Sequence, residues 1–225
     1  MRFFYLQEVV GDLDDLLDWF RETELQLKEA EPPSSDPEVI RVQLKEHKVL
    51  GEEISSQKGR VRDILSAAKK VLREGAQSED SGIIREKMDD LKETTDIVSQ
   101  LSADRLSILE QALPLAEHFF EAHVDLSQWL EEMEAEQMDL ETPAIRADQI
   151  VRQQEVNKYL LAAVSEHKPL FDKLNKTGTT LIRLCIEEEA AKVHDIMESD
   201  NARSLSISNP SNPSIPSIPS IPFHP

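Results

Sequence analysis

Two tryptophans constrain this chain more than any other feature, because the sequence around one repeats around the other. The numbers of Trp19 and Trp129 differ by 110 (129 − 19), and this single gapless offset keeps similar residues aligned from 16–72 to 126–182. A leucine lies three residues before each tryptophan, and a proline lies fourteen residues after it. The 225-residue chain therefore contains two copies of a unit of about 110 residues, and the second copy is the shorter one.

The first copy begins with the apolar periodicity of a long helix. Leu13, Leu16 and Phe20 open a stripe that continues at steps of three and four residues. This spacing places one apolar face along a helix of roughly residues 6–30. Two prolines, Pro32 and Pro33, then end the helix, because proline excludes a continuing helical backbone.

Two further helices complete the first copy. Asp36 and Pro37 are typical N-cap and first-turn residues, and they open a second helix of about 35 residues. After a break at 75–82, a third helical period continues without interruption past Pro114 into the second copy. We therefore expect an all-α protein in which the third helix of the first repeat is also the first helix of the second. Pro114 should kink this helix or mark the repeat boundary.

The second copy lacks part of its third helix. The offset aligns Val193 with Ile83, and only eleven residues remain from Val193 before the composition changes at Ser204. This predicts a third helix that is cut after about three turns, with two-thirds of it missing. The second repeat should then be marginally stable alone, and either self-associate or bind a missing partner helix. The apolar residues expected to have little cover are Leu126, Leu130, Leu161, Val164 and Phe171.

The segment 204–225 at the end of the chain has a different composition. It carries no charged side chain apart from a protonatable His224, and it holds six of the twelve prolines. We expect a disordered Ser/Pro-rich tail. The Pro-Ser-Ile triplets also fit a polyproline II ligand of a proline-binding groove. The absence of a flanking Arg or Lys favours a disordered tail without a binding role over such a ligand. The domains expected are 1–113, 114–203 and 204–225.

Three long helices in each copy, with a tryptophan in the first, form a three-helix, left-handed coiled-coil bundle. This pattern resembles the spectrin repeat, and the specific residues are the Leu-x-x-Trp pairs Leu16/Trp19 and Leu126/Trp129. The resemblance covers about residues 6–203. The segments DLDDLLDWFRETELQLKEAEP and SILEQALPLAEHFFEAHVDLSQWLEEMEAEQ look closest to the plakin-rod repeats of the spectraplakins.

The resemblance implies a structural role. Leu16, Trp19, Leu126 and Trp129 are expected to be core anchors of the two bundles. The expected function is that of an elongated, non-enzymatic spacer or scaffold segment of a cytoskeletal linker, of the actin–microtubule or intermediate-filament cross-linking class. Partners would be cytoskeletal proteins bound through the parent protein, and the location the cytoplasm and cytoskeleton. The alternative is an adaptor module that binds a partner protein through the exposed second repeat or the proline-rich tail.

Composition excludes several other classes. The chain has 25 Lys and Arg against 44 Asp and Glu, a net charge of −19 that lies wholly in residues 1–203. Such a surface disfavours nucleic acid and a basic membrane-surface helix. A lipid-binding protein that opens its bundles on a membrane is a weaker rival for the same reason. No apolar run approaches a spanning helix, and the single Cys185 excludes an internal disulfide and fits a reducing cytosol.

No catalytic, cofactor or metal site is expected. His118 and His123 are five residues apart, which turns their imidazoles to different faces of a helix, so each is interpreted as a surface or stripe-edge residue. The same interpretation holds for His194. Cys185 has no CxxC partner and is interpreted as a structural thiol. The glycines are too widely spaced for a phosphate-binding loop.

Lys58 and Lys168 occupy the same position of the apolar stripe in both copies. One hypothesis is that they fix the pairing of the helices, as polar residues do at core positions of coiled coils. The other is that the aliphatic stem packs while the ammonium group stays in water. The second hypothesis is favoured, because the helices of such a bundle splay enough to admit water.

Overall fold

The computed structural model describes residues 2–74, 80–138 and 146–208, and all secondary structure within these ranges is helical. This confirms the all-α fold class predicted from periodicity. The five helices are α1 (Arg2–Glu29), α2 (Pro37–Glu74), α3 (Asp80–Met138), α4 (Ala147–Ile182) and α5 (Glu187–Ser208).

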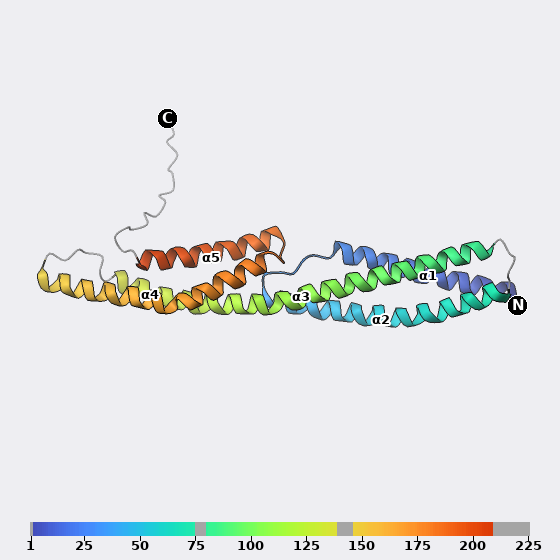
Figure 1. The fold of residues 1–225 in the computed structure, drawn as a ribbon, viewed down its shortest axis with the longest axis horizontal. Helices are drawn as coiled ribbons and strands as arrows, with labels where there is room; N and C mark the ends of the chain where they lie inside the picture. Colours follow the sequence, from blue (N-terminus) through green and yellow to red (C-terminus); the bar gives the residue numbers. More distant parts are fainter. Residues whose placement is uncertain (1, 75–79, 139–145, 209–225) are drawn as a thin grey trace, which may run out of the picture. The chain divides into compact units, whose positions relative to one another are not determined.

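The chain divides into two compact units, Met1–Pro114 and Leu115–Pro225. Helix α3 contributes residues to both units, as the sequence analysis expects, and Pro114 lies inside it at the division. In Figure 1, α1, α2 and the first part of α3 lie side by side; the second part of α3 lies with α4 and α5. Each unit is thus a three-helix bundle, and each is described separately below.

The first unit buries one continuous apolar cluster between its helices. Each helix turns the stripe predicted by its three- and four-residue spacing toward the other two. The connection between α1 and α2 is fixed by polar groups, since the Asp36 carboxylate accepts a hydrogen bond of 2.8 Å from the Glu38 backbone N–H. This is the N-cap expected for Asp36. The largest fully buried side chains of this unit are Phe20, Leu13, Ile40, Ile84, Leu91 and Leu109.

The second unit has a third helix of its own, and α5 is longer than the sequence analysis expects. It has 22 residues, about six turns, instead of three turns. It begins at Glu187, where three successive glutamates favour the positive end of the helix dipole. It continues through residues 204–208, which the composition assigned to the tail. The buried side chain of Ile207 explains this continuation, since it gives the last turn an apolar contact. The remaining tail residues, 209–225, lie outside the described residues.

The expectation that α5 leaves the second unit uncovered is therefore wrong for most of the residues concerned. Leu126, Leu130 and Phe171 are buried, and Val164 is partly buried. Only Leu161 is exposed as expected. The alignment of Val193 with Ile83 is also wrong by one position, because Val193 is buried and Ile83 is exposed. Val193 corresponds instead to Ile84, since the chain between the second and third helices is one residue shorter in the second unit.

Candidate functional site

The four expected anchor residues differ in how deeply the structure places them. Leu16 and Leu126 are buried, and Trp129 is buried with an exposed fraction of 9%. Trp19 is only partly buried, and its indole makes an edge contact with the ring of the adjacent Phe20, with centroids 4.9 Å apart. The anchoring role of these residues stays a prediction, which substitutions can test.

Trp129 occupies an aromatic cluster between α3 and α4. Its ring stacks on the imidazole of His167, with centroids 4.1 Å apart and an interplanar angle of 12°, and lies edge-on to Phe171 at 6.2 Å. The Nδ1–H of His167 donates to the Ala163 carbonyl oxygen at 2.9 Å, which fixes the orientation of the ring. Aromatic contacts of this kind contribute about 0.5–1.5 kcal/mol beyond area burial. The second unit therefore holds its tryptophan more firmly than the first unit does.

A buried carboxylate of α5 is paired with a histidine of α3 in the second unit. Nδ1 of His123 in α3 is 2.7 Å from Oδ2 of Asp200 in α5, and Asp200 is only 1% exposed. The Ser127 hydroxyl lies 3.4 Å from the same nitrogen. The sequence predicts His123 to be a surface or stripe-edge residue, so its partial burial against α5 is a correction, and the helical pattern does not single out Asp200. An offset of 109 in α5 would have found the carboxylate, because it aligns Asp200 with the buried Leu91.

Further polar contacts hold α5 against the other two helices. Arg203 makes two hydrogen bonds to the Glu134 carboxylate, of 2.7 and 2.9 Å, and these raise the pKa of the guanidinium against the opposing effect of burial. Asn175 of α4 and Asn201 of α5 exchange side-chain hydrogen bonds of 3.0 and 2.8 Å. Each buried side-chain nitrogen or oxygen in the described part of the chain has a partner. The α5 interface is consequently polar over about one turn, at residues 200–203.

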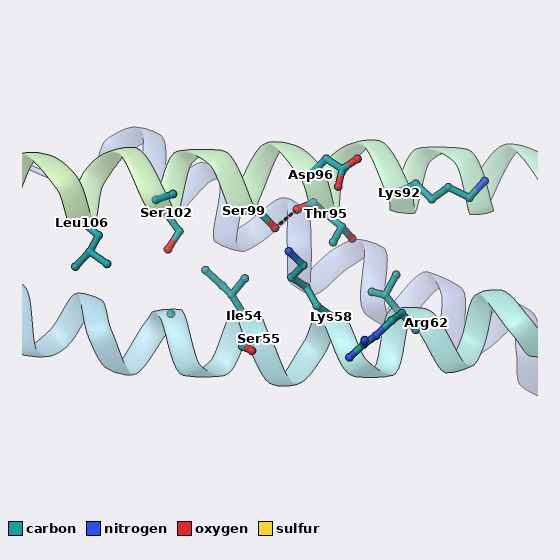
Figure 2. A pocket seen from close by; sticks show the side chains of 13 residues that line it. Ile54, Ser55, Lys58, Arg62, Lys92, Thr95, Asp96, Ser99, Ser102 and Leu106 are labelled. Carbon is teal, nitrogen blue, oxygen red and sulfur yellow. Dashed lines mark hydrogen bonds between the residues drawn. The ribbon is translucent and has the colours of Figure 1, made fainter.

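A groove of about 610 Å³ lies between α2 and α3 of the first unit. Small side chains leave this space open, and Figure 2 shows Lys58 directed from α2 toward Thr95 and Ser99 of α3. The hydroxyls of Thr95 and Ser99 donate to backbone carbonyl oxygens one turn earlier, at 2.6 and 2.7 Å. The groove is therefore lined partly by hydroxyl groups that are already hydrogen-bonded within α3.

The geometry of the two equivalent lysines favours solvation of their ammonium groups. Lys58 is exposed at the groove, and Lys168 is exposed and pairs with Asp172 on its own helix at 3.0 Å. Neither lysine has the buried position that would let it fix helix pairing at a core site. Packing of the aliphatic stems stays a prediction, and the Lys168 side chain is 70% exposed.

The other residues singled out for chemistry are dispersed. Burial, and secondarily the nearby Glu189 carboxylate, raise the pKa of the Cys185 thiol to about 11, so this thiol is protonated and weakly nucleophilic at neutral pH. His118 is exposed, and Nε2 of His194 lies 3.1 Å from Oε1 of Glu198 on the same helix. Within residues 2–74, 80–138 and 146–208, no three His, Cys, Asp or Glu side chains converge as metal ligands would. In the same ranges no helix has the length and apolarity needed to cross a membrane.

The fold and the tryptophan-bearing stripes define a protein built from three-helix bundle repeats. Residues 5–111 match the family model of the spectrin repeat. The chain belongs to the spectrin-repeat family.

Similarity to known proteins extends beyond the first unit. The chain is 31% identical over 175 residues to human (Homo sapiens) microtubule-actin cross-linking factor 1, isoforms 6/7, and likewise to isoforms 1/2/3/4/5. It is 30% identical over 175 residues to the rat (Rattus norvegicus) protein of the same name. These matches cover 78% of this chain, which is more than either unit contains, so they include parts of both units. The chain spans only 5%, 2% and 3% of the lengths of these relatives.

Proposed function

We propose that this chain is a non-enzymatic spacer and scaffold segment of a cytoskeletal linker protein. The observation that carries the proposal is the similarity, running through parts of both units, to part of a protein whose name describes the cross-linking of microtubules and actin. The finer assignment, to actin–microtubule linkers and not to intermediate-filament linkers, rests on the same similarity. Cytoskeletal partners and a cytoplasmic, cytoskeletal location follow as parts of this proposal.

The proposed mechanism is geometric. Helix α2 has 38 residues and α4 has 36, which correspond to about 57 and 54 Å of helix at 1.5 Å per residue. Two such units joined end to end would separate the modules on either side of them by a length that long helices fix. The acidic surface supports solubility and disfavours indiscriminate binding to polyanionic filaments. The second unit is proposed to be a spectrin repeat with a shortened third helix.

Small-angle scattering with mass determination tests the spacer proposal on the full chain. At concentrations where the mass is that of a monomer, a spacer that holds its two units in series should have a maximum dimension above about 90 Å, because the second helix of each unit is about 55 Å long. A monomer no longer than one bundle would contradict the proposal. Co-sedimentation gives a second readout: a pure spacer stays in the supernatant with both actin filaments and microtubules, whereas a filament-binding module pellets with one of them.

An adaptor role is a second candidate, and the exposed apolar residues of α4 favour it. Its tail version is tested by removing residues 209–225, because removal from residue 204 would also delete the buried Ile207 and disturb α5. Loss of a bound SH3-type domain after this deletion, and after replacement of Pro213, Pro216 and Pro219 by alanine, would support the tail as a ligand. Unchanged binding in both variants would contradict it.

A further inference from the structure

The first half of α4 is a helix without buried side chains. From Ala147 to Tyr159 every side chain is exposed or only partly buried, and the first buried residue of the helix is Leu160. The corresponding part of α2 in the first unit is different, because Ile40, Leu44 and His47 are buried there. The two units therefore differ most at this end of their second helices.

The last part of the third helix explains the difference. In the first unit, Nε2 of His47 donates to the Ser102 carbonyl oxygen of α3 at 2.7 Å, and Leu109 and Ala112 further along α3 are buried. In the second unit, the last buried residue of α5 is Ile207, which corresponds to Val98. Within the described residues, α5 has no counterpart of Ser102 or Leu109. Among the residues that the structure describes, none therefore covers the first half of α4 as the end of the third helix covers α2.

The uncovered residues form a stripe at coiled-coil spacing. Ile150, Gln154, Asn157 and Leu161 follow one another at steps of four, three and four residues, and we call them the α4 stripe. Ile150 is 41% exposed and Leu161 is 51% exposed, and the adjacent Val151 is 54% exposed. Exposed apolar side chains at these positions would be stabilised by burial against a second helix, because burial removes apolar surface from water.

The order of residue types along the α4 stripe is the same in both directions. Its order is apolar, amide, amide, apolar, and its spacing of four, three and four residues is symmetric about the midpoint between Glu155 and Val156. When two identical helices pair in antiparallel orientation about this midpoint, Ile150 of one copy faces Leu161 of the other. Gln154 then faces Asn157. Such a contact is isologous, because one surface is complementary to itself.

The amide groups and the charges also suit a second copy. Asn175 and Asn201 already form a reciprocal amide pair inside this unit, which shows the hydrogen bonding that Gln154 and Asn157 would make across two copies. Residues 147–162 carry two acidic and two basic side chains, so this stretch is neutral in a chain of net charge −19. Two copies can therefore approach here without the repulsion that the rest of the acidic surface would cause. The four charged residues are Asp148, Arg152, Glu155 and Lys158.

We propose that two copies of this chain dimerise through the α4 stripe, with the two α4 helices antiparallel. The contact involves about three turns from each copy, so its area lies at the low end for specific interfaces, below about 1,200 Å² in total. The dimer is accordingly weak and reversible, with a dissociation constant of about 10–100 μM. In the spacer proposed above, it would join two chains side by side at their second units.

Sedimentation velocity over a concentration series tests the dimer in the full chain. The wild-type chain should shift from monomer to dimer between about 5 and 300 μM. Leu161→Glu should raise the dissociation constant at least tenfold, and Ile150→Glu should act similarly, because each places a carboxylate against an apolar residue of the other copy. Val124→Glu is the matched control, since Val124 is an exposed apolar residue of α3 in the same unit. It should leave the dimer unchanged.

Cysteine pairing tests the antiparallel geometry. In a Cys185→Ala background, Ile150→Cys mixed with Leu161→Cys should form a disulfide between copies under mild oxidation. Ile150→Cys alone should not, because its two sulfurs would be offset by eleven residues, or about 16 Å along the helix. Equal cross-linking of Ile150→Cys alone would overturn the geometry. A wild-type chain that remains monomeric at the highest concentration of the series, or a dimer insensitive to Leu161→Glu, would overturn the proposal itself. Circular dichroism shows that each variant is folded.

Discussion

The two units reach the same three-helix fold with different cores. The first unit has Leu13 and Leu91 within one apolar cluster, whereas the equivalent residues of the second unit are His123 and Asp200. The stripe that the first unit covers with the end of its third helix is exposed in the second. Backbone topology therefore persists although polar contacts replace apolar ones at these core positions of the second unit. This difference predicts that the two units respond differently to substitution.

The largest expected effect is that of removing the second tryptophan. Trp129→Ala should destabilise the second unit by about 3–5 kcal/mol, because the indole is buried against His167 and Phe171. Trp19→Ala should cost less, about 2 kcal/mol, because Trp19 is partly exposed. Urea unfolding followed by circular dichroism measures both values. In each variant the remaining tryptophan reports fluorescence from the other unit, and that transition should not move. Equal losses would remove this difference between the units.

The pair formed by His123 and Asp200 should give the next largest effect. His123→Leu should destabilise the second unit by about 3 kcal/mol, because it leaves the buried Asp200 carboxylate without its partner. The double variant His123→Leu/Asp200→Leu recreates the leucine pair of the first unit and should recover most or all of this loss, since buried ion pairs are often no more stable than apolar replacements. Urea unfolding of His123→Leu, of Asp200→Leu and of the double variant measures the coupling between the two residues. If the losses of unfolding free energy in the two single variants add up in the double variant, His123 and Asp200 do not stabilise each other.

A tight helix contact should give an intermediate effect. A Cβ atom at Gly178 would lie 2.8 Å from Cε2 of Phe119 and closer still to Sδ of Met197. Gly178→Ala should therefore destabilise the second unit by about 1 kcal/mol, after the gain in helix propensity is subtracted. The first unit has the complementary combination, Val9 with Ala68. Phe119→Val should remove the part of the clash that involves the Phe119 ring and leave the part that involves Met197, so Gly178→Ala should cost less in that background. The midpoint of thermal unfolding measures both effects.

The equivalent lysines should give a small effect of opposite sign in the two units. Lys58→Leu should stabilise the first unit by about 0.5 kcal/mol, because it adds apolar volume to the groove between α2 and α3. Lys168→Leu should be neutral or slightly destabilising, because it removes the pair with Asp172. Sedimentation should show no change of association state in either variant. A change of oligomer number would instead support the hypothesis that these lysines fix the pairing of the helices.

The smallest expected effect is a pH dependence confined to the second unit. The pKa of the Cys185 thiol is raised to about 11 from an ordinary value of 9.0, so the folded state holds this proton more tightly than the unfolded chain. The resulting stabilisation is present below pH 9 and decreases as the pH rises from 9 toward 11. Comparison of urea midpoints at about pH 8 and about pH 10.5 measures it. Cys185→Ser is the control, and it should reduce the difference between the two pH values.

Periodicity predicted the helices well, because the apolar stripe of each long helix can be recognised in a single sequence. The start of α2 at Pro37 and the passage of α3 through Pro114 were predictable from local rules. The extent of α5 was not, because Ser204–Ser208 are weak helix formers whose conformation depends on the burial of Ile207 against other helices. Asp200 was missed for a related reason, since a one-residue change between helices moved it onto a core position. Tertiary contacts decided both cases.

The carboxylate of Asp200 also limits how α5 can be misplaced during folding. If α5 slid by one turn, Asp200 would lose His123 and face apolar neighbours, and an unpaired buried carboxylate costs several kcal/mol. The same slip in the first unit would exchange one aliphatic contact for another, at little cost. The second unit thus has a means of rejecting misaligned intermediates that the first unit lacks. In a chain built from near-identical stripes, this discrimination favours a single folded product over a mixture of slipped bundles.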